Sequence, residues 1–216
     1  MDESIKRPTP TKKTTDCRQK LIDAAVAETA EAGYATLSVE RILRRAGTSR
    51  ASFHTHFADE REAVEAAYQQ LFERYFSRLL RACEAQPSWP LKVKVGIGAT
   101  LDLAAAEPVN ARFLAVDVLA ADRELVLRVI ESRNRLTRLL APGRDGLPHA
   151  DDLPAITEQV LVAGVIGVVS NRLLNGEAAH LPALAPPLVE LTLTPYLGRE
   201  AAAAVARRPR PGAEDH

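Results

Sequence analysis

Residues 33–57 carry the side chains whose types and spacing point most directly to a chemistry, and that chemistry is contact with DNA. The segment has the pattern of a short helix, a tight turn at Gly47-Thr48 and a second short helix with small and basic residues facing outward. A helix-turn-helix unit places its second helix in the major groove of DNA. Because residues 58–216 differ in character, the sequence predicts a second domain behind a DNA-binding one.

These residues resemble the DNA-binding pattern of the tetracycline-repressor (TetR) family of bacterial transcriptional regulators. In that family a helix is followed by Gly-aromatic, Thr/Ser-Val, a short helix to Ala-Gly-Val-Ser, a recognition helix ending aromatic-x-His-Phe, and an acid or Ser. Over residues 17–65 the chain supplies, in the same order, Gly33-Tyr34, Ser38-Val39, Ile42, Ala46-Gly47-Thr48-Ser49, Phe53, His56-Phe57 and Asp59. Farther along, only the layout around Trp89, Pro108 and residues 188–198 is similar to the family's ligand-binding and dimerisation body.

The resemblance implies an all-α fold with about nine helices, in which an N-terminal three-helix helix-turn-helix DNA-binding domain precedes a larger helical ligand-binding and dimerisation domain. It also implies a transcriptional regulator, usually a repressor, that binds a pseudo-palindromic double-stranded DNA operator as a homodimer and is released by a small-molecule effector. Such an effector must prefer the conformation that does not bind DNA, since equal affinity for both would shift nothing. The alternative is an effector-independent DNA-binding protein that acts architecturally or through a protein partner.

Three residues of the second short helix occupy positions that face base edges in the family: Arg50, Ala51 and Thr55. Arginine can bind guanine with two hydrogen bonds, and an Ala or Thr methyl group can pack on the thymine methyl. A phosphate contact alone is the alternative for Arg50, since such contacts are common. On the preceding helix, Glu40 lies where the family sometimes reads a base and could accept from cytosine; a solvated surface acid is the alternative.

Small donors suited to phosphate complete the predicted DNA surface: Ser38, Ser49, Ser52 and His56. Ser38 and Ser49 can equally be helix N-caps, and the two roles are compatible. The chain departs from the family at His54, where Tyr is usual, and at Glu60, where Lys commonly contacts phosphate; Arg61 is the neighbouring substitute. If His54 lies at the phosphate backbone, its protonation should strengthen DNA binding as the pH falls.

Polar groups within apolar helices, together with nearby aromatic rings, are the candidates for a ligand pocket. Pockets for small molecules are mostly apolar and contain a few orienting polar groups. The candidates are Tyr75, Phe76, Trp89, Arg112, Phe113, Asp117, Asn134, Arg138 and Asn171. Salt bridges and core packing are the alternative for each of them.

The longest apolar run, Val160–Val169, contains Gly164 and Gly167. Glycines let two helices approach closely, and helices of two subunits can pack as a four-helix interface. The homodimer is therefore expected to form through helices near 152–176 and 184–198. Relief of crowding inside one subunit is the alternative role for the two glycines.

Motifs of enzymes are missing from the sequence. It contains no G-x-S-x-G elbow, no H-E-x-x-H pair and no P-loop, and Gly96-Ile97-Gly98 lacks the third glycine and the preceding strand of a dinucleotide site. Residues two apart on a helix point away from each other, so His54 and His56 do not predict a metal site. We expect no enzymatic activity, no cofactor and no bound metal.

Composition and charge fit a DNA-binding protein with a helical core. The chain is 46% hydrophobic, 26% charged and only 5% aromatic, which favours helix over strand. Its 28 Lys and Arg balance its 28 Asp and Glu, but residues 1–57 hold ten basic against seven acidic side chains. Cys17 and Cys83 form no Cys-x-x-Cys pair, and no segment suits a signal peptide or a membrane span of about 30 Å. A cytoplasmic location is expected.

Four segments are expected along the chain: a disordered basic arm over 1–16, the helix-turn-helix DNA-binding domain over 17–58, the helical effector-binding and dimerisation domain over 59–200 and a disordered tail over 201–216. Lys6, Arg7, Lys12 and Lys13 of the arm could enter the minor groove, or only solubilise the protein. Hydrophobic periodicity and capping residues predict helices over 17–32 and 38–46, from Ser49, from Asp59 to before Pro87, and near 90–106, 108–120, 122–141, 152–176 and 184–198.

Overall fold

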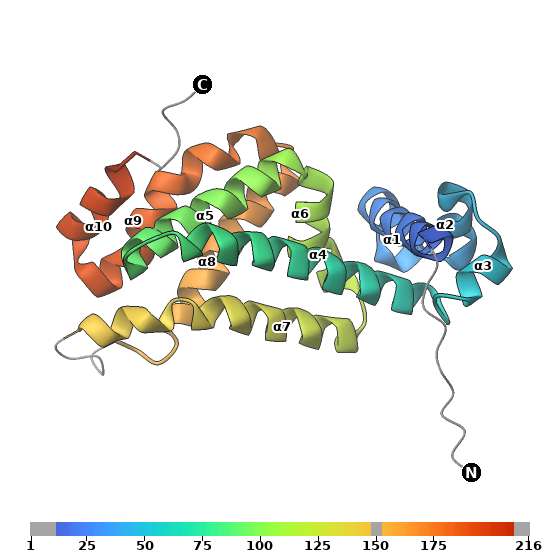
Figure 1. Ribbon diagram of the computed structural model, residues 1–216, viewed down its shortest axis with the longest axis horizontal. Helices are drawn as coiled ribbons and strands as arrows, with labels where there is room; N and C mark the ends of the chain where they lie inside the picture. The colour runs from blue at the N-terminus through green and yellow to red at the C-terminus, as the bar shows by residue number, and fades with distance from the viewer. Residues whose placement is uncertain (1–11, 148–152, 210–216) are drawn as a thin grey trace, which may run out of the picture. The chain divides into compact units, whose positions relative to one another are not determined.

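The computed structural model describes residues 12–147 and 153–209, and every regular element within them is helical (Figure 1). The α-helices are α1 (Lys12–Ala32), α2 (Val39–Ala46), α3 (Arg50–His54), α4 (Glu60–Glu84), α5 (Trp89–Ala106), α6 (Pro108–Ala115), α7 (Arg123–Arg138), α8 (Thr157–Leu174), α9 (Ala185–Leu197) and α10 (Arg199–Arg207). Short 3-10 helices accompany them: η1 (Tyr34–Thr36), η2 (Asp117–Ala120), η3 (Ala141–Gly146) and η5 (Ala178–Leu184). The all-α prediction is confirmed, with ten α-helices in the described residues. None of these helices is long and apolar enough to cross a membrane.

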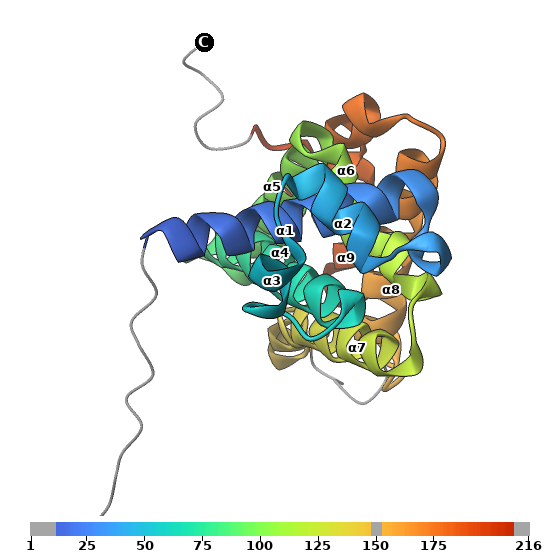
Figure 2. The same cartoon turned by 90° about the vertical axis from the view of Figure 1, so that its right-hand side faces the viewer.

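The chain divides into two compact units, the first ending at Tyr68 and the second beginning at Gln69. In the first unit α2 packs on α1, and α3 contacts both of them (Figure 2). Its side chains that are at most 1% exposed are Leu21, Ile22, Ala25, Thr29, Ile42, Phe53, Ala63, Val64 and Ala67. Because Ala63, Val64 and Ala67 belong to the first turns of α4, this unit extends beyond residue 58, where the sequence analysis placed its end.

Helix starts follow the capping residues that the sequence predicts. The side-chain oxygen of each capping residue accepts a hydrogen bond from the backbone amide three residues later. The capping residues are Ser38, Ser49, Asp59 and Asp122. Asp59 accepts from the amide of Glu62 at 2.8 Å, while the Glu62 carboxylate accepts from the amide of Ala58 at 2.6 Å. The first bond satisfies an amide that the first turn of α4 would otherwise leave without a partner, and the second ties that turn to the residue before Asp59.

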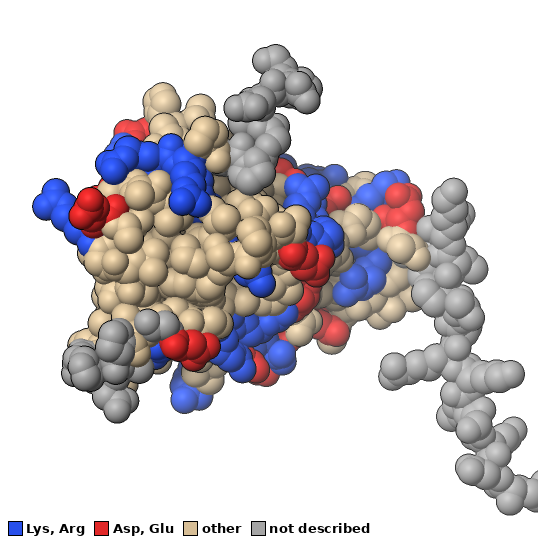
Figure 3. Space-filling model, turned by 60° about the vertical axis from the view of Figure 1, so that its left-hand side comes forward, with Lys and Arg blue, Asp and Glu red and all other residues tan. Residues whose placement is uncertain are grey.

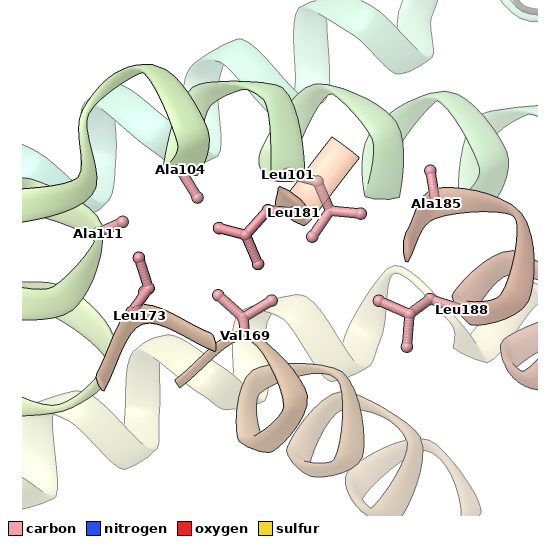
Figure 4. Close-up of a cluster of buried hydrophobic side chains, with 8 residues drawn as sticks. All are labelled: Leu101, Ala104, Ala111, Val169, Leu173, Leu181, Ala185 and Leu188. Carbon is pink, nitrogen blue, oxygen red and sulfur yellow. The ribbon is translucent and has the colours of Figure 1, made fainter. Parts of the chain in front are cut away.

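The second unit is built around α5, which contacts α9, α6, α10 and η5, while α10 packs along α9. In one core cluster Leu101 of α5 lies among Val169 and Leu173 of α8 and Leu188 of α9 (Figure 4). A second cluster joins Val93, Leu140, Val189, Leu193, Ala202 and Ala206. Chain segments that are far apart in the sequence therefore share two apolar cores.

The N-terminal end contains more helix than the sequence analysis predicts. α1 begins at Lys12, so residues 12–16 of the expected disordered arm are helical. Residues 1–11, with Lys6 and Arg7, lie outside the described residues. The polar and basic composition of this segment hid the extra helical turn, because it carries no apolar stripe of its own.

The C-terminal end also differs from the prediction of a disordered tail over 201–216. α10 covers Arg199–Arg207, and residues 210–216 lie outside the described residues. The Nζ of Lys94, a buried side chain of α5, donates to the backbone carbonyls of Val205 at 2.8 Å and Ala206 at 3.1 Å. This ammonium stabilises the last turn of α10, because it hydrogen bonds to carbonyls at the C-terminal end of the helix.

Three of the expected helices are shorter than predicted. The helix near 108–120 is divided into α6 and η2, because Val116 leaves the helical conformation with φ −127° and ψ −62°. The helix expected near 122–141 ends at Arg138, and η3 follows it. The helix expected near 152–176 is α8, which begins at Thr157.

Candidate DNA-binding surface and ligand cavity

The turn between α2 and α3 depends on Gly47. This residue has φ 63° and ψ 39°, a left-handed conformation that a side chain disfavours. Its amide donates to the carbonyl of Leu43, and the amide of Thr48 donates to the same carbonyl at 3.2 Å. The chain can therefore end α2 and start α3 at once, which is the geometry that a helix-turn-helix unit requires.

Two phenylalanines fix the orientation of α3. Phe53 is fully buried and Phe57 nearly so, and their ring centroids lie 5.7 Å apart. With this face held in the core, the opposite face of the helix is exposed. The predicted DNA-contacting residues that are exposed there or at its start are Ser49, Arg50, Ala51, His54 and Thr55.

The remaining predicted DNA-binding residues differ in their surroundings. Ser38, His56 and Arg61 are half-buried, and Glu40 is exposed. Ser52 is the exception among the proposed phosphate donors, because its Oγ lies 3.1 Å from Sγ of Cys17 on α1. The Ser52 hydroxyl therefore faces α1 instead of solvent, which its position in the sequence did not reveal.

Ion pairs distinguish structural arginines from exposed ones in this unit. The nearly buried carboxylate of Glu28 accepts from Nε of Arg41 at 2.8 Å and from Nε of Arg45 at 2.7 Å, and these two bonds hold α2 on α1. They also hold the pKa of Glu28 below its usual value, against the opposing effect of burial. Arg50 pairs instead with Glu40, and both side chains are exposed.

Arg44 is a candidate DNA contact that sequence reasoning missed. It lies in the last turn of α2, is exposed, and forms no ion pair with any residue that the structure describes. The signal that could have identified it is its place on the polar face of the amphipathic segment 39–46, beside the turn. Among the described residues there is also no group of three His, Cys, Asp or Glu side chains that could hold a metal ion.

A cavity of about 520 Å³ lies within the second unit, among α4, α5, α7, α8 and α9. Its walls are mostly aliphatic, with Leu79, Val93, Ile97, Leu161 and Val165 among the lining residues. Small-molecule pockets in proteins commonly have volumes of about 300–1,000 Å³ and apolar walls. The charged residues that line it are Glu84, Lys92 and Arg138, and because all three are exposed, they mark its opening.

Trp89 and Arg138 are the two predicted ligand-binding residues that line this cavity. The indole Nε1 of Trp89 donates to the carbonyl of Leu139 at 3.1 Å, and the ring packs edge-on against Tyr196 with centroids 5.0 Å apart. A side chain at Gly143 would collide with both rings, since its Cβ would lie 2.4 Å from Trp89. The indole is therefore fixed in the cavity wall by contacts on several sides.

The other seven predicted ligand-binding residues do not line the cavity: Tyr75, Phe76, Arg112, Phe113, Asp117, Asn134 and Asn171. Arg112 and Asp117 form an ion pair with Nε and Oδ1 3.2 Å apart. Phe113 is fully buried in the core, and Phe76 packs under the guanidinium of Arg135 at 4.3 Å. These side chains have the packing and ion-pair roles that were the alternative interpretation.

The remaining three of these seven residues also lie outside the cavity wall. Asn134 and Asn171 are exposed on their helices, whereas the Tyr75 hydroxyl is buried elsewhere, and this burial raises its pKa. Most of the cavity-lining residues that sequence reasoning missed are apolar side chains of α4, α5 and α8, and the others come from α7, α9 and the segment 139–142. The helical spacing of Phe72, Phe76, Leu79 and Leu80 in the sequence of α4 was the available signal.

The arrangement defines a protein class: a small helix-turn-helix domain with an exposed second helix, in a chain whose other unit encloses an apolar cavity. This is the organisation of a DNA-binding transcription regulator with a ligand-binding domain. The family described as bacterial regulatory proteins, tetR family, matches residues 21–67. The predicted resemblance to the TetR family is thus confirmed, and this segment is a TetR-family DNA-binding domain.

Solved structures extend the fold comparison to most of the chain. A fatty acid degradation regulator FadR from Bacillus halodurans has a TM-score of 0.74 and 22% identity, covering 87% of this chain and 97% of its own. FadR from Bacillus subtilis, solved in complex with stearoyl-CoA, has a TM-score of 0.70 and 19% identity, covering 82% and 97%.

A third similar structure is SmeT, the repressor of the Stenotrophomonas maltophilia multidrug efflux pump SmeDEF, with a TM-score of 0.65 and 21% identity, covering 84% and 92%. At these identities the similarity establishes the fold of the larger unit. No curated protein matches the chain.

Proposed function

We propose that this protein is a homodimeric transcriptional repressor that leaves a pseudo-palindromic operator when a small apolar molecule enters the cavity of its second unit. The observation that carries the proposal is the cavity of about 520 Å³ in a chain with a TetR-family DNA-binding domain. The alternative, a DNA-binding protein that responds to no effector, has no use for such a cavity. To release DNA, the ligand must favour the conformation that does not bind the operator.

The DNA-binding half of the proposal assigns base contacts to the exposed residues of α3. Arg50, Ala51 and Thr55 would face base edges, while Ser38, Ser49 and His56 would donate to phosphate. Arg61 and the exposed Arg44 would add positive charge at the backbone, and Glu60 would oppose it. His54 is exposed, so it would be free to contact the phosphate backbone at the position where the family usually has Tyr.

Self-association through α8 and α9 is supported by exposed apolar side chains on these helices. Ile156, Val160 and Leu174, at the start and along α8, and Leu191 on α9 are each 57–59% exposed. Figure 3 shows, on one face of the molecule, a broad area of uncharged residues. Exposed apolar side chains that gather on an uncharged face are typical of protein interfaces.

The two glycines of α8 favour the same interpretation. A Cβ placed on Gly164 or Gly167 would meet no atom within 4 Å. Crowding inside one subunit therefore does not call for glycine at these positions. Close approach of a second copy, which the sequence analysis expects, favours glycine there.

The chemistry of the cavity suggests a ligand with a long hydrocarbon chain and an anionic head. The aliphatic walls suit the chain, and Lys92 and Arg138, which outnumber the single acid Glu84 at the opening, suit the anion. FadR from Bacillus subtilis was solved with stearoyl-CoA. We therefore propose a long-chain acyl thioester as the first ligand class to test.

Fluorescence of Trp89 provides the test, because it is the only tryptophan of the chain and it lines the cavity. Stearoyl-CoA should change its emission saturably, whereas coenzyme A alone should not. Val165→Phe, which narrows the cavity, should weaken this response, while Val109→Phe, at an exposed position outside the cavity, should not. No change with stearoyl-CoA would reject this ligand class.

A genomic pull-down of bound DNA, followed by a shift assay on the recovered fragments, tests release. The fragments should leave the protein on addition of the ligand that changes Trp89 emission. Retention of DNA at saturating ligand would favour the effector-independent alternative. Val165→Phe should bind the same fragments and release them only at higher ligand concentration.

A further inference from the structure

We infer that Glu40 determines which base the protein reads, by holding the guanidinium of Arg50 in one orientation toward the DNA. The inference rests on the proposed function, in which α3 enters the major groove. Glu40 lies in the first turn of α2 and Arg50 is the first residue of α3, so the two belong to different helices of the helix-turn-helix unit. Their side chains form an ion pair between Oε1 of Glu40 and Nη2 of Arg50.

The exposure of this pair separates it from the other ion pairs of the unit. The side chains of Arg50 and Glu40 are 62% and 60% exposed, whereas the side chain of Glu28, between Arg41 and Arg45, is only 10% exposed. An exposed ion pair contributes little to folding, because water and salt screen it. The fold therefore gains little from the Arg50–Glu40 pair, which points to a role at the surface that meets DNA.

Arginine at such a surface has two competing partners. It can donate two parallel hydrogen bonds to guanine O6 and N7, or it can bind a phosphate, which carries no sequence information. A carboxylate beside the guanidinium repels phosphate, and it also fixes one edge of the planar group. Glu40 therefore disfavours the backbone contact and leaves the remaining N–H groups of Arg50 for a base.

The second carboxylate oxygen adds a direct contact. Oε2 of Glu40 has no hydrogen-bond partner among the described residues, and a carboxylate can accept from the N4 amino group of cytosine. Placed beside a guanine that Arg50 reads, it would favour a cytosine in the neighbouring base pair. Repulsion of phosphate by Glu40 lowers affinity for DNA of any sequence, so discrimination is gained at the expense of overall binding.

The experiment is selection from a pool of randomised duplexes with the full chain and its variants. The wild-type protein should enrich a two-fold symmetric motif with one strongly preferred guanine in each half. Arg50→Ala should lose the preference for that guanine. Glu40→Gln should lower it about tenfold, within the discrimination that a bidentate arginine contact provides, and should bind DNA of unrelated sequence more tightly.

Two further variants separate orientation from charge. Glu40→Asp keeps the charge but shortens the side chain, so it should lose guanine preference as Glu40→Gln does. Glu60→Gln removes a half-buried acid from the start of α4, and it should strengthen binding to all sequences without changing the motif. Thermal unfolding of each variant checks that the domain is folded, which the exposure of Glu40 and Arg50 leads us to expect.

If Glu40→Gln enriched the same motif as the wild type, with the same preference for guanine, the inference would be overturned and the proposed function would remain intact. A motif retained by Glu40→Asp but lost with Glu40→Gln would also overturn it, since charge alone would then suffice. If the wild-type protein enriched no motif at all, both the proposed function and this inference would fail.

Discussion

Arg144 of η3 and Glu158 of α8 form a two-pronged ion pair, with Nε and Oε1 2.7 Å apart and Nη2 and Oε2 2.9 Å apart. The hydroxyl of Tyr196 donates to the same Oε1 at 3.0 Å, and the Tyr196 ring lies against Trp89 in the cavity wall. Glu158 is buried, so its charge needs these partners. The ion pair is thus one side chain away from the proposed ligand site.

Glu158→Gln should destabilise the protein by about 2–3 kcal/mol, because it leaves the guanidinium of Arg144 without its charged partner in a largely buried position. Urea unfolding of the two proteins measures the difference. Glu131→Gln is the control, because Glu131 is exposed on α7, and it should change stability by less than about 0.5 kcal/mol. Equal stability of Glu158→Gln and wild type would show that the pair contributes nothing.

The contribution of Glu158 should also depend on pH. Hydrogen bonds from Arg144 hold the pKa of Glu158 below its usual value, outweighing burial, which raises it. A lowered pKa means that the stabilisation is complete above the unfolded-state pKa of about 4.3 and is lost as the pH falls through the lower folded-state pKa. The stability difference between wild type and Glu158→Gln should therefore be constant from pH 7 to about 5 and shrink below it. A difference that grows with acid would reverse the sign we assign.

Thr48→Val should stabilise the DNA-binding domain by about 1 kcal/mol. The Thr48 hydroxyl is buried and has no hydrogen-bond partner among the described residues, and valine keeps the shape while removing the unsatisfied group. Thermal unfolding measures the change. Thr36→Val, at an exposed position whose hydroxyl donates to the Ala32 carbonyl at 2.8 Å, should not stabilise. A lower melting temperature for Thr48→Val would indicate that the hydroxyl has a partner, such as water.

Gly47→Val should abolish DNA binding, because a β-branched residue cannot adopt the left-handed conformation of this turn without strain. Gly47→Asn should retain most binding, since asparagine tolerates that conformation. No atom lies within 4 Å of a Cβ placed there, so strain and not collision separates the two variants. DNA-binding assays and sedimentation together should find that Gly47→Val loses DNA but keeps the oligomeric state of the wild type. Tight DNA binding by Gly47→Val would contradict the turn assignment.

The DNA-binding domain could be predicted almost entirely from sequence, because its determinants are local. The caps at Ser38 and Ser49 act within one turn, and Gly47 acts through its own backbone. Its tertiary details could not be predicted in the same way. The sequence predicts that Ser52 is a phosphate donor on the surface. In the structure, the packing of α3 on α1 brings its hydroxyl to Cys17.

The cavity was the least predictable part, because periodicity tells which face of a helix is apolar but not which neighbour that face meets. Of the candidates taken from the sequence, Trp89 and Arg138 line the cavity, whereas Arg112 and Asp117 pair with each other away from it. The helix α10 was missed for a related reason. Its buried face is made only of small alanine side chains, which give a weak periodic signal, and its anchor, Lys94, lies on a helix more than a hundred residues earlier in the chain.

That anchor has a consequence for how the protein is made. Lys94 is buried, and its ammonium hydrogen bonds to the carbonyls of Val205 and Ala206. These acceptors lie close to the C-terminal end of the described chain, so they are synthesised late. Domains fold as the chain leaves the ribosome, N-terminal parts first. The DNA-binding domain can therefore fold early, while the larger domain must wait for its C-terminal helix before the ammonium finds its acceptors. A ribosome-bound chain would thus hold a finished DNA-binding domain before the larger domain is complete.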